Sequence, residues 1–299
     1  MKFFSCGLIL LVMIVSFAGA EEYEPVTMIV AKWGNGIGEF GLRLEAEGNC
    51  PQSISVDARG NLAILDAVNR RIQLYSTLGN WLKSIPVTIQ AFDVKYVDDR
   101  IFILDPYNYF IEEFNHIGKH LRKVEINQKI DMIDGLRFDG NQVCIQTYEQ
   151  KQYCVGSSNS KTVQIQSERA GLSGNSRDVR FQTRWLNQHE GALLIEDDQS
   201  KNNRTIPIHC DESIGSIIFL DTDKYGHIFI RLELFDQVGK SIFEIHKLNS
   251  KGEPVSKFRI QNSNRVMPYR PIALDSEGNV YSMQILDHGF FVVKWRVKR

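Results

Sequence analysis

The sequence lacks the features that several common classes of protein require. Its 299 residues include 35 lysines and arginines against 36 aspartates and glutamates, so the net charge is −1. Nucleic-acid binding depends on a strongly basic face, and this balance argues against that class of function. After residue 20, no apolar run approaches the roughly 20 residues of a membrane span. We therefore expect no nucleic-acid partner and no membrane span in the mature chain.

Motifs for metal and nucleophile chemistry are also missing: the sequence has no C-x-x-C, H-E-x-x-H or G-x-S-x-G. Gly36 to Gly41 match G-x-G-x-x-G, but a dinucleotide site needs a following helix in a βαβ unit, which the sequence does not predict. Asp221 to Gly226 resemble the start of a calcium loop, but Leu232 stands where the bidentate glutamate belongs. We therefore predict no cofactor and no metal site, and we assign no catalytic residue.

The first 20 residues have the pattern of a secretory signal peptide. Lys2 supplies the positive charge, residues 7–17 are almost all apolar, and Ala18-Gly19-Ala20 forms a small-x-small cleavage site. We predict cleavage after Ala20, which makes the mature protein secreted or periplasmic.

Four cysteines follow this segment, an even number in a chain expected to reach an oxidising compartment. Cys144 and Cys154 flank a predicted hairpin centred on Glu149, which places them opposite each other on paired strands. Cross-strand Cβ atoms lie about 4.5–5.5 Å apart, close to the range of a disulfide, so we predict this bridge. A bridge between Cys50 and Cys210 follows only by elimination, and the sequence leaves their pairing open.

The sequence is rich in internal repetition. Residues 64–87 and 103–126 align without a gap and share an Ile-Leu-Asp opening, an asparagine at Asn69 and Asn108, and a turn glycine at Gly79 and Gly118. Short alternating strands with frequent turns are typical of β-meanders. Repeats of about 40 to 50 residues indicate the blades of a β-propeller.

Six such units fit into residues 21–299, at about 46 residues each. The last unit has three predicted strands, whereas the strand predicted at residues 26–33 has no hairpin partner. Pairing the two would close the ring and remove its open edges. We therefore predict one all-β domain, residues 21–299: a six-bladed β-propeller of four-stranded antiparallel blades, closed by the N-terminal strand.

The first unit resembles an NHL repeat. The resemblance is carried by Gly36-Ile37-Gly38-Glu39-Phe40, Pro51, Ile54-x-Val56-Asp57-x-x-Gly60-Asn61 and Asp66-x-x-Asn69-x-Arg71-Ile72-Gln73, and Asp57-x-x-Gly60-Asn61 recurs as Asp275-x-x-Gly278-Asn279. It implies a six-bladed propeller, and many members of the family are binding platforms. A minority are extracellular enzymes that work around the central channel, such as amidating lyases, and lactonases have a related fold.

Corner loops that differ between blades are where a rigid ring usually recognises partners. Arg70, Tyr107 and Tyr109 occupy such corners, and tyrosine and arginine are enriched at binding hot spots. Phe235 lies in an insertion at residues 231–241 that is more apolar than a solvated loop requires. The alternative for this insertion is a hairpin of longer strands turning near residues 236–239.

These residues predict an exported binding scaffold that recognises a protein, peptide or glycan on one face of the ring, and they favour a binding protein over an enzyme. The alternative is a channel-centred extracytoplasmic enzyme of the lyase, metal-dependent hydrolase or lactonase type. An enzyme would place several acidic, histidine or asparagine side chains together at the channel mouth, and the sequence shows no such set. The oligomeric state and the binding face stay unassigned.

Overall fold

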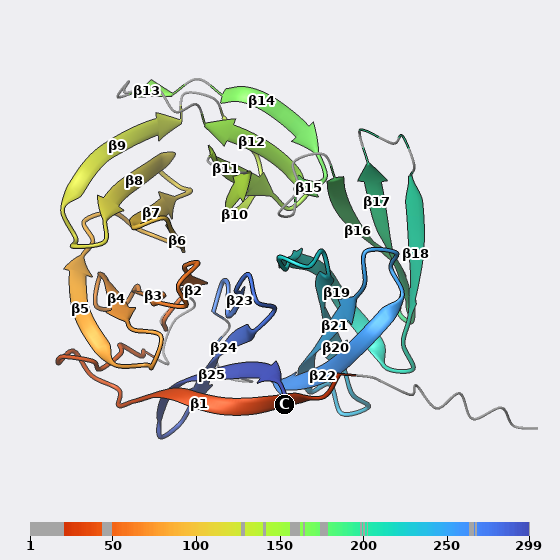
Figure 1. The fold of residues 1–299 in the computed structure, drawn as a ribbon. Helices are drawn as coiled ribbons and strands as arrows, with labels where there is room; N and C mark the ends of the chain where they lie inside the picture. The colour runs from red at the N-terminus through yellow and green to blue at the C-terminus, as the bar shows by residue number, and fades with distance from the viewer. Residues whose placement is uncertain are drawn as a thin grey trace, which may run out of the picture.

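In the computed structural model, six β-sheets follow one another around a ring in chain order (Figure 1). The structure describes residues 21–43, 50–126, 129–139, 142–155, 162–163, 165–173, 179–197, 199, 201, 203–262, 266 and 268–298. This arrangement confirms the predicted all-β, six-bladed propeller. The predicted signal segment lies outside the described residues. The described part of the chain contains no helix with the length and apolar character needed to cross a membrane.

Each blade is an antiparallel meander that runs from an inner strand to an outer strand. Blade one contains β2 Ser53–Val56, β3 Leu62–Asp66, β4 Arg71–Tyr75 and β5 Trp81–Pro86. Blade two contains β6 Asp93–Val97, β7 Arg100–Asp105, β8 Phe110–Asn115 and β9 His120–Ile126. Blade three contains β10 Ile133–Asp139, β11 Gln142–Thr147, β12 Lys151–Val155 and β14 Ile165–Ala170. Blade four contains β15 Leu172–Ser173, β16 Val179–Asn187, β17 Glu190–Asp197 and β18 Arg204–His209. Blade five contains β19 Ser213–Thr222, β20 Ile228–Phe235, β21 Ser241–Leu248 and β22 Pro254–Gln261. Blade six contains β23 Ile272–Leu274, β24 Val280–Leu286, β25 Gly289–Val297 and β1 Tyr23–Ala31.

One short strand departs from the predicted pattern. The segment after the cysteine hairpin is predicted to continue blade three, and β14 does so, but β13, Thr162–Val163, pairs in parallel with β9 of blade two and gives that sheet a fifth strand. The outer strand of blade three is β14. The exposed edge of β9 offers unpaired backbone groups, and the passing chain satisfies some of them.

The N-terminal strand closes the ring as predicted. β1 pairs antiparallel with β25, from Tyr23 opposite Val297 to Ala31 opposite Phe290. Ile29 on this strand is buried in a core cluster that also contains Ile54 of blade one. The first strand of the described chain therefore completes the last blade and joins it to the first.

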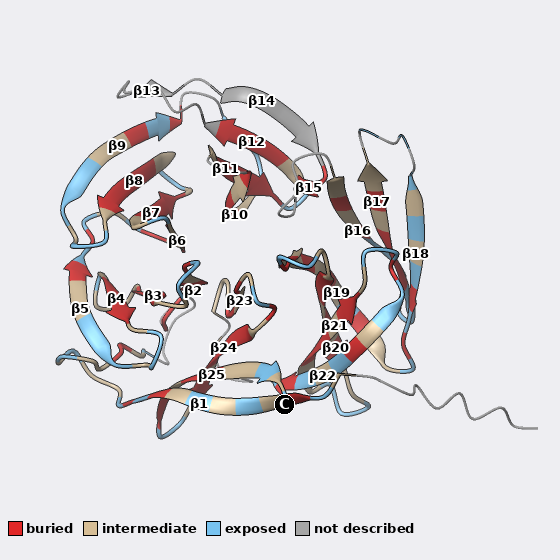
Figure 2. Ribbon diagram, in the orientation of Figure 1, coloured by how far each residue is buried: buried red, intermediate tan, exposed pale blue. Residues whose placement is uncertain are grey.

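Buried residues occur along the strands of the ring (Figure 2), and many of them belong to apolar clusters between neighbouring blades. Between blades one and two, Leu65 and Ile72 pack in one cluster with Val94 and Ile103. Alternation along each strand produces this arrangement, since every second side chain of a strand points to the same face of its sheet.

The repeated Asp and Asn residues stabilise the corners between the second and third strands of a blade. Asn69 donates a hydrogen bond to Asp66 at 2.8 Å, and Asn108 donates one to Asp105 at 2.9 Å. Asp223 has a similar local role, since it accepts hydrogen bonds from the backbone N–H groups of Tyr225 and His227. The segment that resembles a calcium loop is therefore a turn stabilised by its own aspartate.

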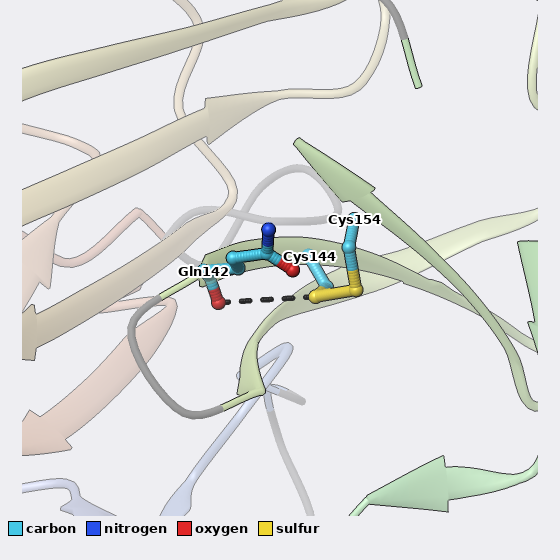
Figure 3. Close-up of a disulfide and its surroundings, with 3 residues drawn as sticks. All are labelled: Gln142, Cys144 and Cys154. Atoms are coloured by element: carbon cyan, nitrogen blue, oxygen red, sulfur yellow. Dashed lines mark hydrogen bonds between the residues drawn. A yellow bond between two sulfur atoms is a disulfide. The ribbon is translucent and has the colours of Figure 1, made fainter. Parts of the chain in front are cut away.

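The predicted disulfide is present. Cys144 and Cys154 face each other across β11 and β12 and form a bond of 2.03 Å (Figure 3). Cys50 and Cys210 are buried free thiols, so the pairing that the sequence left open does not form. Burial raises the pKa of the Cys50 thiol to about 12, which keeps it in the unreactive protonated form.

Closure by β1 predicts that substitutions at two neighbouring residues of that strand change the free energy of unfolding by different amounts. Ile29 is 3% exposed and Val30 is 72% exposed. Ile29→Ala should lower the free energy of unfolding by roughly 2–4 kcal/mol, because it removes buried methyl groups where two blades meet. Val30→Ala should change it by less than about 0.5 kcal/mol. Urea titration of both variants measures the contrast, and equal effects would contradict closure by this strand.

The disulfide should stabilise the protein by restricting the unfolded chain. Its half-cystines are 10 residues apart, and a loop of this size predicts a loss of about 2–3 kcal/mol in the Cys144→Ala/Cys154→Ala variant. Reducing agent should destabilise the wild type and Cys50→Ala but leave the double variant unchanged. A wild type that is insensitive to reduction would overturn the prediction.

Candidate functional site

The connections between second and third strands emerge together on one face of the ring, because the strands of every blade alternate in direction. We call this the corner face, formed by residues 67–70, 106–109, 148–150, 188–189, 236–240 and 287–288. Three blades hold these corners by the same backbone hydrogen bond. The backbone N–H of Val87 donates to the carbonyl oxygen of Arg70 at 2.9 Å, and that of Ile126 donates to the carbonyl oxygen of Tyr109 at 2.9 Å. In blade four, the backbone N–H of Cys210 donates to the carbonyl oxygen of His189 at 3.0 Å.

The corner residues predicted as contacts lie on this face with different exposures. Arg70 is exposed, and Tyr107 is 64% exposed. Tyr109 is half-buried and has a left-handed backbone, with φ of 56°. Arg70 and Tyr107 are therefore the corner residues best placed to contact a partner. Their role in recognition stays a prediction.

The insertion that contains Phe235 forms a hairpin rather than a projecting loop. β20 ends at Phe235, and β21 begins at Ser241 after the turn. Phe235 is half-buried, and its ring lies so close to Gly215 of β19 that a Cβ added there would meet it at 2.3 Å. The insertion therefore forms a hairpin of longer strands, the alternative that the sequence also allowed. A role for Phe235 in binding stays a prediction.

Aromatic side chains connect the corner face with the ring axis. We call Tyr107, Phe92, Tyr269 and Tyr148 the aromatic rim. The ring centres of Phe92 and Tyr107 lie 5.0 Å apart, and those of Phe92 and Tyr269 lie 5.9 Å apart. Tyr148 is 56% exposed and interacts with the hydroxyl group of Tyr269. Sequence reasoning missed three members of the rim, although Tyr148 was recognisable as the third-blade counterpart of Tyr107.

Beneath the rim, a cavity of about 80 Å³ lies among the inner strands, and Tyr269 forms part of its wall. Lys95 and Asp221 line this cavity and also a second one of about 240 Å³, which reaches the turns at Asp98 and Asp275. The channel therefore has a narrow charged section between the corner face and these turns.

Arg137 bridges blades three and five inside the channel. The inner strand of blade four has only two residues, so the side chain of Arg137 reaches from β10 past that blade to β19. Its guanidinium donates to the carbonyl oxygens of Phe219 at 2.9 Å and Leu220 at 2.6 Å, and it lies 3.7 Å from Asp221. It also donates to Gln146 at 2.8 Å. This arginine is fully engaged in holding the wall together.

Arg270 makes a second crossing, from blade six to blades two and three. It donates to the carbonyl oxygens of Leu136 at 3.0 Å and Asp134 at 3.3 Å and lies 3.5 Å from the Asp93 carboxylate. A Cβ at Gly135 would approach Arg270 to 2.4 Å, so glycine is needed for this close contact. The second arginine is also engaged structurally.

Two other cations of the wall have no such partners. Among the residues that the structure describes, no hydrogen bond or ion pair engages Lys95 or Arg231, and the buried Nε atom of Arg231 is unsatisfied. Burial lowers the pKa of Lys95 to about 8, with the charge of Arg270 adding to the effect, and burial lowers the pKa of Arg231 to about 10. Both side chains are half-buried, and both shifts reflect the partial loss of water around a positive charge.

Acidic groups of the channel are affected by burial in the opposite direction. Burial raises the pKa of Asp134, against the effect of the nearby Arg270. Burial also raises the pKa of Tyr269, which donates a hydrogen bond to the carbonyl oxygen of Ile133 at 3.1 Å. Within the described ranges, no group of three or more His, Cys, Asp or Glu side chains is arranged to hold a metal ion.

Solved structures share this fold at low sequence identity. A member of the DUF4221 family from Bacteroides vulgatus aligns with a TM-score of 0.54 and 11% identity, over 94% of this chain and 99% of that chain. A chain of a mitotic checkpoint complex aligns with a TM-score of 0.55 and 11% identity, over 83% and 90%. A streptogramin B lyase aligns with a TM-score of 0.50 and 10% identity, over 92% and 98%. No family model matches the sequence, and no curated protein matches it. The similarity shows the β-propeller fold and leaves function to the site.

The lowered pKa of Lys95 predicts a pH-dependent cost in stability. Lys95→Met should be more stable than the wild type at pH 7, because the folded wild type then holds a costly ammonium group. As pH rises through about 8, Lys95 deprotonates in the folded state but stays protonated in the unfolded state, so the wild type gains stability. The difference between the two proteins should shrink by about 2 kcal/mol between pH 7 and 9.5. Urea titrations across this range measure it, and a constant difference would contradict the assignment.

Proposed function

We propose that this protein is an exported binding scaffold that engages a protein, peptide or glycan through its corner face. The observation that carries the proposal is the set of exposed aromatic side chains on or beside the corners of three consecutive blades. Tyr107, Tyr148 and Trp185 are 64%, 56% and 55% exposed. Tyrosine and tryptophan supply large contact areas and lose little conformational entropy on binding, because each has only two side-chain torsions.

The rigidity of the ring supports this role. Tyr107 lies in a corner anchored by Asp105 and Asn108, and the indole of Trp185 donates to the carbonyl oxygen of Ile214 at 2.9 Å. A corner backbone and an indole held in this way need little ordering when a partner binds, and affinity gains from such preorganisation.

Export and relationship to NHL-repeat propellers belong to the same proposal. The N-terminal sequence has the pattern of a cleaved signal, and a disulfide is typical of proteins in oxidising compartments. The NHL-like segment Asp57-x-x-Gly60-Asn61 forms a turn. In this turn the Asp57 carboxylate accepts hydrogen bonds from the backbone N–H groups of Arg59 and Asn61. Many proteins of that family are binding platforms.

The second candidate is a channel-centred enzyme of the lyase or hydrolase type. It is favoured by the buried titratable groups of the channel, since Lys95, Asp134 and Tyr269 have pKa values shifted by burial and line one cavity. Shifted pKa values are common at active sites, although structural ion-pair networks also produce them. Turnover of a bound ligand distinguishes the enzyme from the scaffold.

Substitutions on the two faces of the ring test the proposal. The mature protein is screened against arrays of glycans and peptides, and the ligands found are titrated by calorimetry. Tyr107→Ser/Tyr148→Ser should weaken binding at least about tenfold, as expected for hot-spot residues. Leu78→Ser/Ile117→Ser is the matched control, because Leu78 and Ile117 are exposed in connections between third and fourth strands on the opposite face.

Both double variants should retain the thermal stability of the wild type, since all four side chains are exposed. Loss of binding in the control but not in the corner variant would assign recognition to the opposite face and overturn the proposal. Conversion of a ligand to product, abolished by substitution of Lys95 or Asp134, would establish the enzyme instead.

A further inference from the structure

The channel contains positive charge that its own carboxylates leave unneutralised. Among the described residues, the charged groups of the narrow cavity wall are Lys95, Arg137, Arg231, Arg270, Asp134 and Asp221. Arg137 and Arg270 make the two crossings described above, with backbone carbonyl oxygens as their main acceptors. Lys95 and Arg231 are left over, and they come from blades two and five.

Among the described residues, no oxygen accepts a hydrogen bond from Arg231, and its Nε atom is both buried and unsatisfied. Its guanidinium carbon lies 4.4 Å from the ring centre of Phe243, and a ring face attracts a cation without satisfying its five donors as a carboxylate would. Of the acids that act on Arg231, Glu233 raises its pKa most and Asp134 less, while Arg270 opposes them. The oxygens of Glu233 accept hydrogen bonds from Ser241 at 2.9 Å and Ser216 at 3.3 Å, so this carboxylate is engaged elsewhere.

The charged groups near Lys95 are of both signs, and within the described part of the chain none of them forms an ion pair with it. Arg137 and Arg270 repel its ammonium group, whereas Asp93 and Asp221 attract it. Asp93 accepts hydrogen bonds from Ser53 and from the backbone N–H groups of Val94 and Leu136.

Asp221 and Asp134 also interact mainly with groups other than Lys95. Asp221 lies beside Arg137. Asp134 accepts a hydrogen bond from Gln146, and burial favours its neutral form. The acids around the channel are therefore committed to other partners or disfavoured as anions.

We propose that the channel binds an oxyanion group, a carboxylate or a phosphate, through Lys95 and Arg231. Both side chains are half-buried in the wall of one cavity, and the Nε atom of Arg231 is buried and unsatisfied, so an anion bound there supplies acceptor oxygens that the described residues do not. The planar guanidinium of an arginine matches the geometry of carboxylate and phosphate oxygens, and a lysine adds a mobile point charge.

The size and position of the cavity limit how such a ligand binds. A volume of about 80 Å³ admits a small charged group but not a whole peptide or sugar chain. Tyr269 belongs both to this cavity wall and to the aromatic rim, so a ligand on the corner face reaches the cations with a terminal acidic group. This last step rests on the proposed function, whereas binding of a free oxyanion does not.

Titration with inorganic phosphate and with succinate tests the site and separates the two kinds of oxyanion. Calorimetry at constant ionic strength, in a buffer of neither anion, should detect saturable binding of at least one of them at pH 7. Lys95→Met and Arg231→Gln should each weaken it at least about tenfold, and Arg231→Lys, which keeps the charge, should weaken it less. Lys251→Gln is the matched control, since Lys251 is exposed in the turn after β21 and should bind as the wild type does.

The pH dependence supplies a readout that altered folding would not imitate. Wild-type affinity should fall as pH rises from 7 to 9.5, because the free site loses the proton of Lys95, whereas Lys95→Met should bind weakly at all these values. Thermal melts confirm that each variant is folded. No saturable binding of either anion, or equal binding in wild type, Lys95→Met and Arg231→Gln, would overturn the inference.

Failure of this inference and failure of the proposed function give different results. Tyr107→Ser/Tyr148→Ser should bind phosphate or succinate as the wild type does, because neither residue lines the narrow cavity. A protein that binds a corner-face ligand but neither anion would retain the scaffold function and lose only the channel site.

Discussion

The pairing of β1 with β25 is the interaction on which the rest of the structure depends. Each blade buries its faces against two neighbours, so the array has no complete core until its ends meet. Ile29 of β1 and Phe290 of β25 share a cluster with Ile54 and Ile64 of blade one, which makes the junction as apolar as the other interfaces. Closure also removes two sheet edges that would otherwise expose unpaired backbone groups.

A closed ring still requires its inner wall to be filled, and here the filling is polar. The inner strand of blade four is too short to form its share of the wall, and Arg137 spans the gap with hydrogen bonds to β19. Arg270 crosses elsewhere and approaches Asp93. Such arginines exchange hydration for several well-placed acceptors, which is the condition under which a buried charge is tolerated.

The same condition separates the two channel arginines that the architecture accounts for from the two cations of the proposed anion site. Arg137 and Arg270 have carbonyl and carboxylate acceptors, so the architecture accounts for them. Lys95 and Arg231 are half-buried in the wall of the same cavity and have no hydrogen-bond acceptor among the described residues, and burial lowers their pKa values. Burial without compensation lowers stability, and such a cost is typical of a site shaped for a ligand.

The sequence by itself determined the features that depend on local order and period. The repeat of residues 64–87 at 103–126, the unpaired strand at the N-terminus and the spacing of Cys144 and Cys154 were sufficient to predict six blades, closure and the disulfide. In each case one strand follows another, and period-two alternation fixes which residues face each other. The corner positions of Arg70 and Tyr107 followed in the same way.

Only the tertiary structure decided what meets at the ring axis. Lys95, Arg231 and Arg270 lie on blades two, five and six, and no spacing in the sequence relates them. In the sequence, each looks like one more charged residue on the solvated face of a strand. Their presence in the wall of one cavity depends on the curvature of the whole ring, which is a property of many packed residues rather than of any local pattern.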